Sequence, residues 1–145
     1  MSQEHSIEIL NRLLAIYCRS FPMYLTHARP WTHVGDQRAI EAVELVVADQ
    51  RAIAERISQL ILEGGGLPDP GKFPLLFTDV HDLSLDYLIR EAIQYQKADI
   101  VAIQQCVEAF NYVLAMKPLA EEALGLAKGH LESLEELIAT KAVSK

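Results

Sequence analysis

The sequence lacks the features that mark membrane and secreted proteins. Its apolar stretches are shorter than the roughly 20 residues that a helix needs to cross a bilayer, so no membrane partner is expected. The first ten residues, MSQEHSIEIL, lack the basic stretch and apolar block of a secretory signal. Cys18 and Cys106 lie far apart without CxxC spacing, and we interpret them as reduced thiols in helices. These absences together predict a cytoplasmic protein.

Basic residues are also scarce, with 13 Lys and Arg against 20 Asp and Glu and a formal net charge of −7. Proteins that hold nucleic acid by its phosphates need a basic surface, and the final segment TKAVSK supplies only two lysines. No nucleic-acid partner is therefore expected. The stretch GGGLPDPGK lacks the GxxxxGK[ST] pattern of a phosphate-binding loop, so it indicates a helix terminator instead.

What the chain does have is a large apolar fraction in helical spacing. Half of its 145 residues are hydrophobic, enough to bury a sizeable core, and residues 1–145 are predicted to form a single domain. Apolar residues recur at steps of three and four, which is typical of amphipathic helices. The buried stripe predicted for the second helix is Ile40, Val43, Val47, Ala54, Ile57 and Ile61, with a neighbouring stripe of Val46, Ile53 and Leu60. The stripe predicted for the third helix is Ile89, Ile93, Ile100, Ile103, Val107, Phe110 and Leu114. Asp49 and His130 also fall at inward-leaning positions of their helices. A kink or break is expected at Pro22. The predicted helices span about 7–28, 36–63, from 79 or 82 to 117, and from 118 into the polar tail.

The connection between the second and third predicted helices is much longer than the other two. It contains GGGLPDPGKFP, which is too rich in glycine and proline to be helical, and Phe73 to Phe77 is expected to be locally extended. Roughly 15 residues are enough to run back along the length of a helix bundle. The pattern therefore predicts an all-α four-helix bundle with one long crossover between helices 2 and 3.

Four short segments resemble bacterioferritin, and the second also resembles its Dps relatives. They are Tyr-Leu-Thr-His-Ala-Arg at 24–29, Ala-Glu-Arg-Ile at 54–57, Glu-Gly-Gly-Gly-Leu-Pro at 63–68 and Gly-His-Leu-Glu at 129–132. Their order and spacing cover nearly the whole chain. The resemblance implies a ferritin-like four-helix bundle.

The resemblance also implies a di-iron centre, for which this chain lacks most ligands. Ferritin-like centres take one carboxylate from each of two helices and a Glu-x-x-His pair from each of the other two. Residues three apart project to the same side of a helix, yet no Glu-x-x-His occurs in this sequence. The first-helix carboxylate falls at Tyr17, and the two pairs fall at Val46 with Asp49 and at Ala127 with His130.

The third-helix ligand position falls at Glu91 or Gln94, and both alternatives stay open. The positions where the centre is degenerate are Tyr17, Val46, Gln94 and Ala127. The haem-ligating methionine of bacterioferritin falls near Val47, so no haem is expected. A largely lost ferroxidase centre follows, because buried iron needs anionic ligands that valine and alanine do not supply.

The remaining polar residues allow two interpretations. Asp49, His130 and Glu91 are candidate ligands of a single ion, iron or another divalent metal. Alternatively, Tyr17 and His130 satisfy Asp49 in a hydrogen-bonded layer, which needs no metal and is the favoured interpretation.

Four further residues have less specific roles. His27 leans inward in the pattern and is expected to be a core or interface histidine. Trp31 is expected in a subunit contact or a packed loop. His33 is expected in solvent, and His81 at an acidic helix start.

Three functions are consistent with these observations. The first is a ferritin-like protein that acts through assembly or partner binding, with no catalytic residues and no bound cofactor. The second is an iron-binding or iron-storage protein with weak ferroxidase activity, and the third is a mononuclear metal or small-ligand binder. The resemblance also implies a homodimer or higher homo-oligomer, since the first two helices of the bundle often form an antiparallel dimer face in that family, and the second helix is apolar on more than one stripe, which fits this expectation.

Overall fold

The computed structural model describes residues 2–29, 37–79, 84–111 and 113–143, and these residues contain helices and no strands, which confirms the all-α prediction. Among them, no helix is both long and apolar enough to cross a lipid bilayer. The elements are α1 (Gln3–Cys18), α2 (Phe21–Ala28), α3 (Gln37–Glu63), the 3-10 helix η1 (Leu75–Asp79), α4 (Leu85–Ala109) and α5 (Lys117–Val143).

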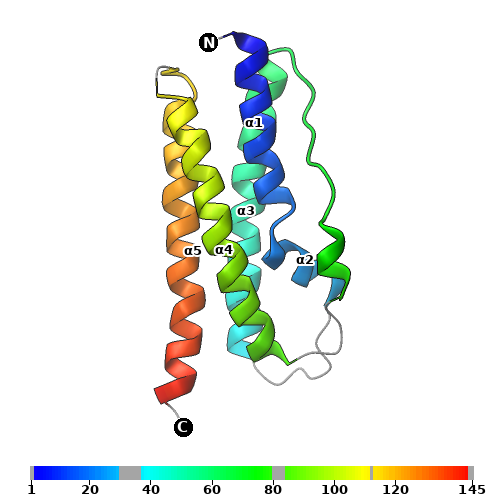
Figure 1. The fold of residues 1–145 in the computed structure, drawn as a ribbon, viewed down its shortest axis with the longest axis vertical. Coiled ribbons are helices and arrows are strands. Elements are labelled where there is room, and N and C mark those ends of the chain that lie inside the picture. The colour runs from blue at the N-terminus through cyan, green and yellow to red at the C-terminus, as the bar shows by residue number, and fades with distance from the viewer. Residues whose placement is uncertain (1, 30–36, 80–83, 112, 144–145) are drawn as a thin grey trace.

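The four long helices lie side by side along the long axis of the molecule (Figure 1). The closest pairings are α4 with α5 and α1 with α3, and further contacts join α1 to α4 and α3 to α5. After α3 the chain runs back along the outside of the helices to η1, so α3 and α4 run in the same direction (Figure 1). The short α2 lies beside η1 at one side of this assembly.

The connection from Gly64 to Pro74 is fastened to α1 by side chains. The Asn11 amide donates to the Leu67 carbonyl at 3.2 Å and accepts from the Asp69 backbone N–H at 2.7 Å. The Arg19 Nε–H donates to the Pro70 carbonyl at 2.6 Å. These bonds pair backbone groups of an irregular segment and hold it against α1.

The first predicted helix is two helices, and the break precedes Pro22. Ser20 caps α2 by accepting a hydrogen bond from the Met23 N–H at 3.2 Å, and Pro22 lies in the first turn. A proline is tolerated there because its missing N–H has no helical partner in any case. The proline therefore starts a helix here rather than kinking one.

The third predicted helix is too long at both ends. Ser84 caps α4 through the Tyr87 N–H at 3.2 Å, so the helix begins at Leu85 and not at Asp79 or Asp82. It ends at Ala109 rather than Lys117, and Leu114, predicted on its buried face, is 83% exposed. The segment predicted to be extended at Phe73 to Phe77 instead enters η1 at Leu75.

Two adjoining clusters form the core. One cluster joins α1 to the second half of α3, the end of α4 and the first half of α5, and it includes Leu10, Leu14, Ile57, Phe110 and Ala123. The other cluster joins α2 and η1 to the first halves of α3 and α4 and to the second half of α5, and it includes Phe21, Val43, Phe77, Leu88 and Leu134. The predicted α3 stripe is confirmed, since Val43, Val47, Ile57 and Ile61 are all buried.

Aromatic rings hold η1 against the long helices. The ring centroids of Phe21 and Phe77 are 5.0 Å apart, and Tyr95 lies 4.9 Å from Phe21 and 5.0 Å from Phe77. Such pairs contribute about 0.5–1.5 kcal/mol each beyond their burial. The contact fixes the end of the long connection on α4.

Replacing Gly66 by alanine is expected to destabilise the protein by about 1–3 kcal/mol, because a close-packed site resists an added methyl group. The new Cβ would lie 2.8 Å from Ile7 Cγ2 and 3.1 Å from Ile61 Cγ2. Gly129→Ala is the matched control, since a Cβ there meets nothing within 4 Å in mid-α5. The control should stabilise by about 0.5–1 kcal/mol through helix propensity. Urea unfolding measures both, and equal effects would contradict the packing at Gly66.

Candidate functional site

The candidate site lies between α3 and α5, at the edge of the interior. The structure brings two of the predicted residues together there: His130 Nε2 of α5 lies 2.9 Å from Asp49 Oδ2 of α3. His130 is buried, whereas the Asp49 side chain is 55% exposed. The pair therefore sits at the edge of the interior, with the carboxylate reaching solvent.

The other ring nitrogen of His130 is without a partner. Its Nδ1 atom is buried, and no hydrogen-bond partner lies near it among the described residues. With a carboxylate on Nε2, the imidazole is oriented as a hydrogen-bond donor toward Asp49. The geometry holds the ring in place and suits a structural pair.

Tyr17 makes a different bond from the one predicted. Its hydroxyl donates to the Ala123 carbonyl of α5, and not to Asp49. Burial raises the pKa of the Tyr17 hydroxyl well above its usual range, and the charge of Asp99 raises it further. The hydroxyl is therefore a neutral donor that joins α1 to α5, and the predicted bond to Asp49 is wrong.

Sequence reasoning missed the two most deeply buried amides. Gln96 Nε2 of α4 donates to the Ala127 carbonyl at 3.0 Å, while its Oε1 atom is buried without a partner in the described part of the chain. Gln50 of α3 accepts from the Ser20 hydroxyl at 2.7 Å. Each lies three residues from a predicted apolar position, Ile93 or Val47, so helical spacing alone marked both as inward-facing.

The third helix offers neither predicted residue to the pair. Gln94 is exposed and Glu91 is half-buried. Burial raises the pKa of the Tyr95 hydroxyl, and the charge of nearby Glu91 raises it further. Among the residues the structure describes, no three His, Cys, Asp or Glu side chains form a group able to hold a metal ion. A metal held by Asp49, His130 and Glu91 stays a prediction for which two of the three residues are in contact.

The residues at the implied di-iron positions do not fit an iron centre. Tyr17, Val46 and Ala127 are 1%, 2% and 0% exposed and belong to the core. A phenol, a valine and an alanine supply no negative charge to offset buried iron. No chemistry through iron follows from this arrangement.

The remaining histidines and cysteines lie outside the pair. His27 is exposed, with its ring centroid 6.3 Å from that of Phe73, so it is not a core histidine, and its place in an interface stays a prediction. Trp31, His33 and His81 fall outside the described residues. Cys18 and Cys106 are free thiols whose pKa values burial raises, which disfavours the reactive thiolate.

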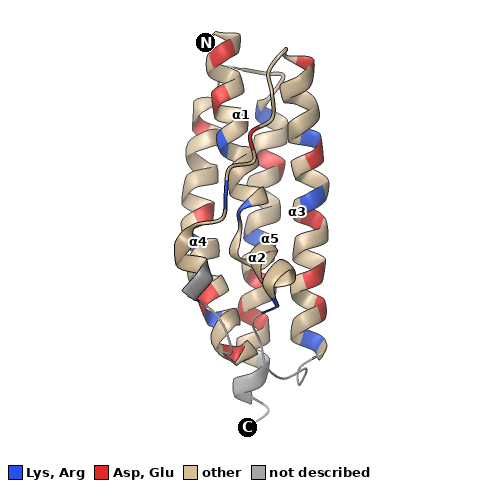
Figure 2. Ribbon diagram, turned by 90° about the vertical axis from the view of Figure 1, so that its right-hand side faces the viewer, with Lys and Arg blue, Asp and Glu red and all other residues tan. Residues whose placement is uncertain are grey.

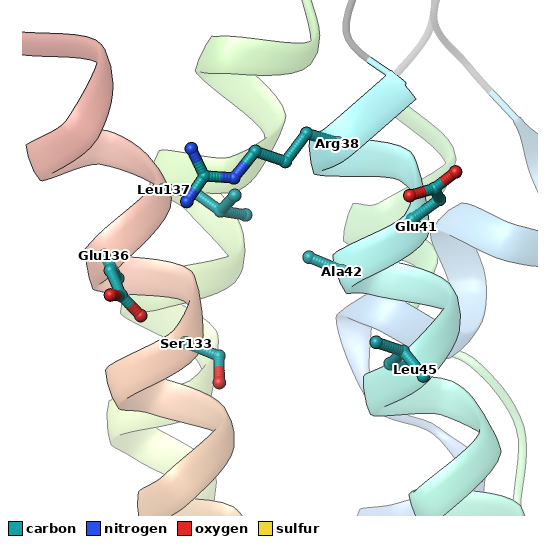
Figure 3. A pocket seen from close by; sticks show the side chains of 7 residues that line it. All are labelled: Arg38, Glu41, Ala42, Leu45, Ser133, Glu136 and Leu137. Atoms are coloured by element: carbon teal, nitrogen blue, oxygen red, sulfur yellow. The ribbon is translucent and has the colours of Figure 1, made fainter.

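A shallow depression of about 260 Å³ lies between the start of α3 and the end of α5. Figure 3 shows Arg38 extending from α3 toward α5, above Leu137. Glu41, Ala42 and Leu45 line its α3 side, and Ser133, Glu136 and Leu137 line its α5 side. Its charges are of both signs, so it selects no ligand class.

Comparison of the chain with models of protein families, with curated proteins and with solved structures finds no match.

Proposed function

We propose that this chain is a ferritin-like protein that has lost its di-iron chemistry and acts through assembly or partner binding. One observation carries the proposal: apolar core side chains occupy the positions where the resemblance requires iron ligands. Val46 and Ala127 are closed off from solvent, and the Tyr17 hydroxyl is engaged with a backbone carbonyl.

The path of the chain supports the ferritin-like assignment. Helices α3 and α4 run in the same direction and are joined by a segment that travels along the outside (Figure 1). A single long crossover of this kind distinguishes ferritin-like bundles from simple up-and-down ones. The break between α1 and α2 departs from the single first helix that the resemblance implies.

The surface of α3 supports assembly, although by a different stripe from the one predicted. Val46 and Ile53, the second stripe, are buried within the chain and cannot face a partner. A further outward row with steps of three and four is exposed instead, and Leu45 is 69% and Leu62 52% exposed. The row comprises Leu45, Ala48, Ala52, Glu55, Gln59 and Leu62.

A second copy of the chain is the partner that this row suits. Alanines in the middle of the row allow close approach of another helix, and leucines at its ends add apolar area. The charged residues of α3 are mixed in sign (Figure 2), and they are Arg38, Glu41, Glu44, Asp49, Arg51, Glu55, Arg56 and Glu63.

Mass and iron chemistry measured on one untagged sample test the proposal. Light scattering after size exclusion is expected to give a dimer or larger assembly that Ala52→Glu dissociates, whereas Glu44→Gln, on the same helix, leaves it intact. Aerobic Fe(II) oxidation is expected at the rate of buffer alone. Oxidation well above that rate, abolished by His130→Ala, would instead establish the iron-protein alternative. One metal per chain, lost in the Asp49→Ala and His130→Ala double variant, would establish the metal-binding one.

A further inference from the structure

A pocket lies between α1, the long connection and α4, away from the Asp49–His130 pair. It has a volume of about 410 Å³ and is lined by charged and aromatic side chains from all three segments. Figure 2 shows the connection passing across this side of the molecule, over the helices. The residues that matter are Arg12, Arg19, Lys72, Phe77, Tyr95 and Asp99.

Three cations line the pocket, although the chain is acidic overall. Arg12, Arg19 and Lys72 are three of only 13 basic residues in a chain of net charge −7. Within the described residues, none of the three forms an ion pair. Cations gathered in a concave site without ion-pair partners attract an anion.

Arg19 is held in place before any ligand arrives. Its Nε–H donates to the Pro70 carbonyl at 2.6 Å, and its guanidinium carbon lies 5.0 Å from the centroid of the Phe73 ring. The other N–H groups of the fork are not used by these contacts. A fixed guanidinium loses less entropy on binding a carboxylate than a free one does.

Asp99 lies in the same pocket and is also unpaired. It is half-buried and has no hydrogen bond or ion pair among the described residues. Burial raises the pKa of its carboxyl from 3.8 to about 7. The Asp99 carboxyl therefore makes no ion pair with Arg12, Arg19 or Lys72, although all four residues line the same pocket.

The wall of the pocket provides a surface for a ring. Phe77 and Tyr95 meet at 5.0 Å with their planes 78° apart, and Pro74 flanks them. Aromatic ligands pack against such edge-to-face pairs with a gain beyond the apolar area. The three cations, the aromatic wall and the unpaired Asp99 carboxyl together favour a ligand that carries an acid group, a ring and a hydrogen-bond donor.

We propose that this pocket binds a small ring-bearing organic anion, whose acid group contacts Arg12, Arg19 and Lys72 and whose hydroxyl or amino group donates to Asp99. The pocket shares no residue with the implied iron positions or with the exposed row on α3. The proposal is therefore independent of the proposed assembly function.

Three probes that differ by one group each test this site by NMR titration of the full chain. They are 4-hydroxybenzoate, benzoate without the hydroxyl, and 4-hydroxybenzyl alcohol without the acid. The expected affinity order is 4-hydroxybenzoate, then benzoate, then the alcohol, with amide shifts centred on Arg19, Gly71 and Asp99. Loss of the hydroxyl should weaken binding about tenfold, as a missing hydrogen bond to a charged partner does, and loss of the acid group, which contacts three cations, should weaken it more than tenfold.

Two variants with one matched control separate recognition from general electrostatics. The double variant Arg12→Gln with Lys72→Gln should bind 4-hydroxybenzoate at least about tenfold more weakly, since two charged hydrogen bonds are removed. Arg51→Gln with Lys97→Gln removes the same charge from exposed positions and should have little effect. Asp99→Leu should bring 4-hydroxybenzoate to the affinity of benzoate. Equal weakening by both double variants, amide shifts centred elsewhere, or no binding of either acid would overturn the proposal.

Discussion

Ala127→Glu is expected to lower the free energy of unfolding at pH 7 by about 3–5 kcal/mol, the range for an uncompensated buried charge. Ala127 is 0% exposed, and its carbonyl already accepts the Gln96 amide, so the new carboxylate has no donor waiting for it. Urea unfolding followed by circular dichroism measures the change. Lys128→Glu, the exposed neighbour, should change stability by no more than about 0.5 kcal/mol.

The pH dependence of unfolding separates the effect of the charge from the effect of side-chain size in Ala127→Glu. A buried glutamate has a raised pKa, so the loss of stability should shrink as the pH falls and the group becomes neutral. Ala127→Gln has nearly the same volume without the charge, and its loss should not depend on pH.

The substitution would also recreate the Glu-x-x-His spacing with His130, beside Asp49. Zn²⁺ should therefore raise the unfolding midpoint of Ala127→Glu but not of Ala127→Gln. The same response to Zn²⁺ in both variants would contradict the ferritin-like register.

Asp99→Asn is expected to stabilise the protein at pH 8 by about 1–3 kcal/mol, a figure reduced from the full pKa shift because the carboxyl is partly exposed. Burial raises the pKa of Asp99 from 3.8 to about 7, so the folded state keeps its proton over a range where the unfolded state has lost it. Stability therefore falls as the pH rises from about 4 to 7. The asparagine lacks this penalty, so no gain is expected at pH 4.

Neighbouring groups do not remove this pH dependence. Tyr17 faces Asp99 as a neutral phenol, and Arg12, Arg19 and Lys72 line the same pocket without pairing with it. Thermal unfolding of wild type and Asp99→Asn at several pH values measures the difference. Glu44→Gln, at an exposed position on α3, is the control and should run parallel to wild type. Parallel curves for Asp99→Asn as well would show that Asp99 is solvated.

Helical spacing predicted most of the buried surface, because the period of an α-helix is a local property of the chain. Val43, Val47 and Ile57 were assigned to the core from their steps alone, and all three are buried. The same spacing placed His130 on an inward stripe, where it is buried, but the inward position predicted for Asp49 is wrong, because its side chain is 55% exposed and meets His130 at the edge of the interior.

Helix ends and partners of polar groups were harder to predict. Apolar residues continue past Ala109 with helical steps, so the sequence does not show that the chain turns at Phe110 and leaves Leu114 in solvent. Tyr17 was predicted to hydrogen-bond Asp49, yet its hydroxyl donates to the backbone carbonyl of Ala123. A side-chain stripe defines a direction, whereas a hydrogen-bond partner depends on which helix is packed there.

By itself, the sequence determined that the chain is helical and which side chains form most of its core. Each of these properties follows from residue type and from spacing along one helix. Only the tertiary structure decided that the long connection closes over α1 and α4 and gathers Arg19, Lys72 and Asp99 into one pocket. Residues this far apart in the chain come together through packing between elements, which no local pattern encodes.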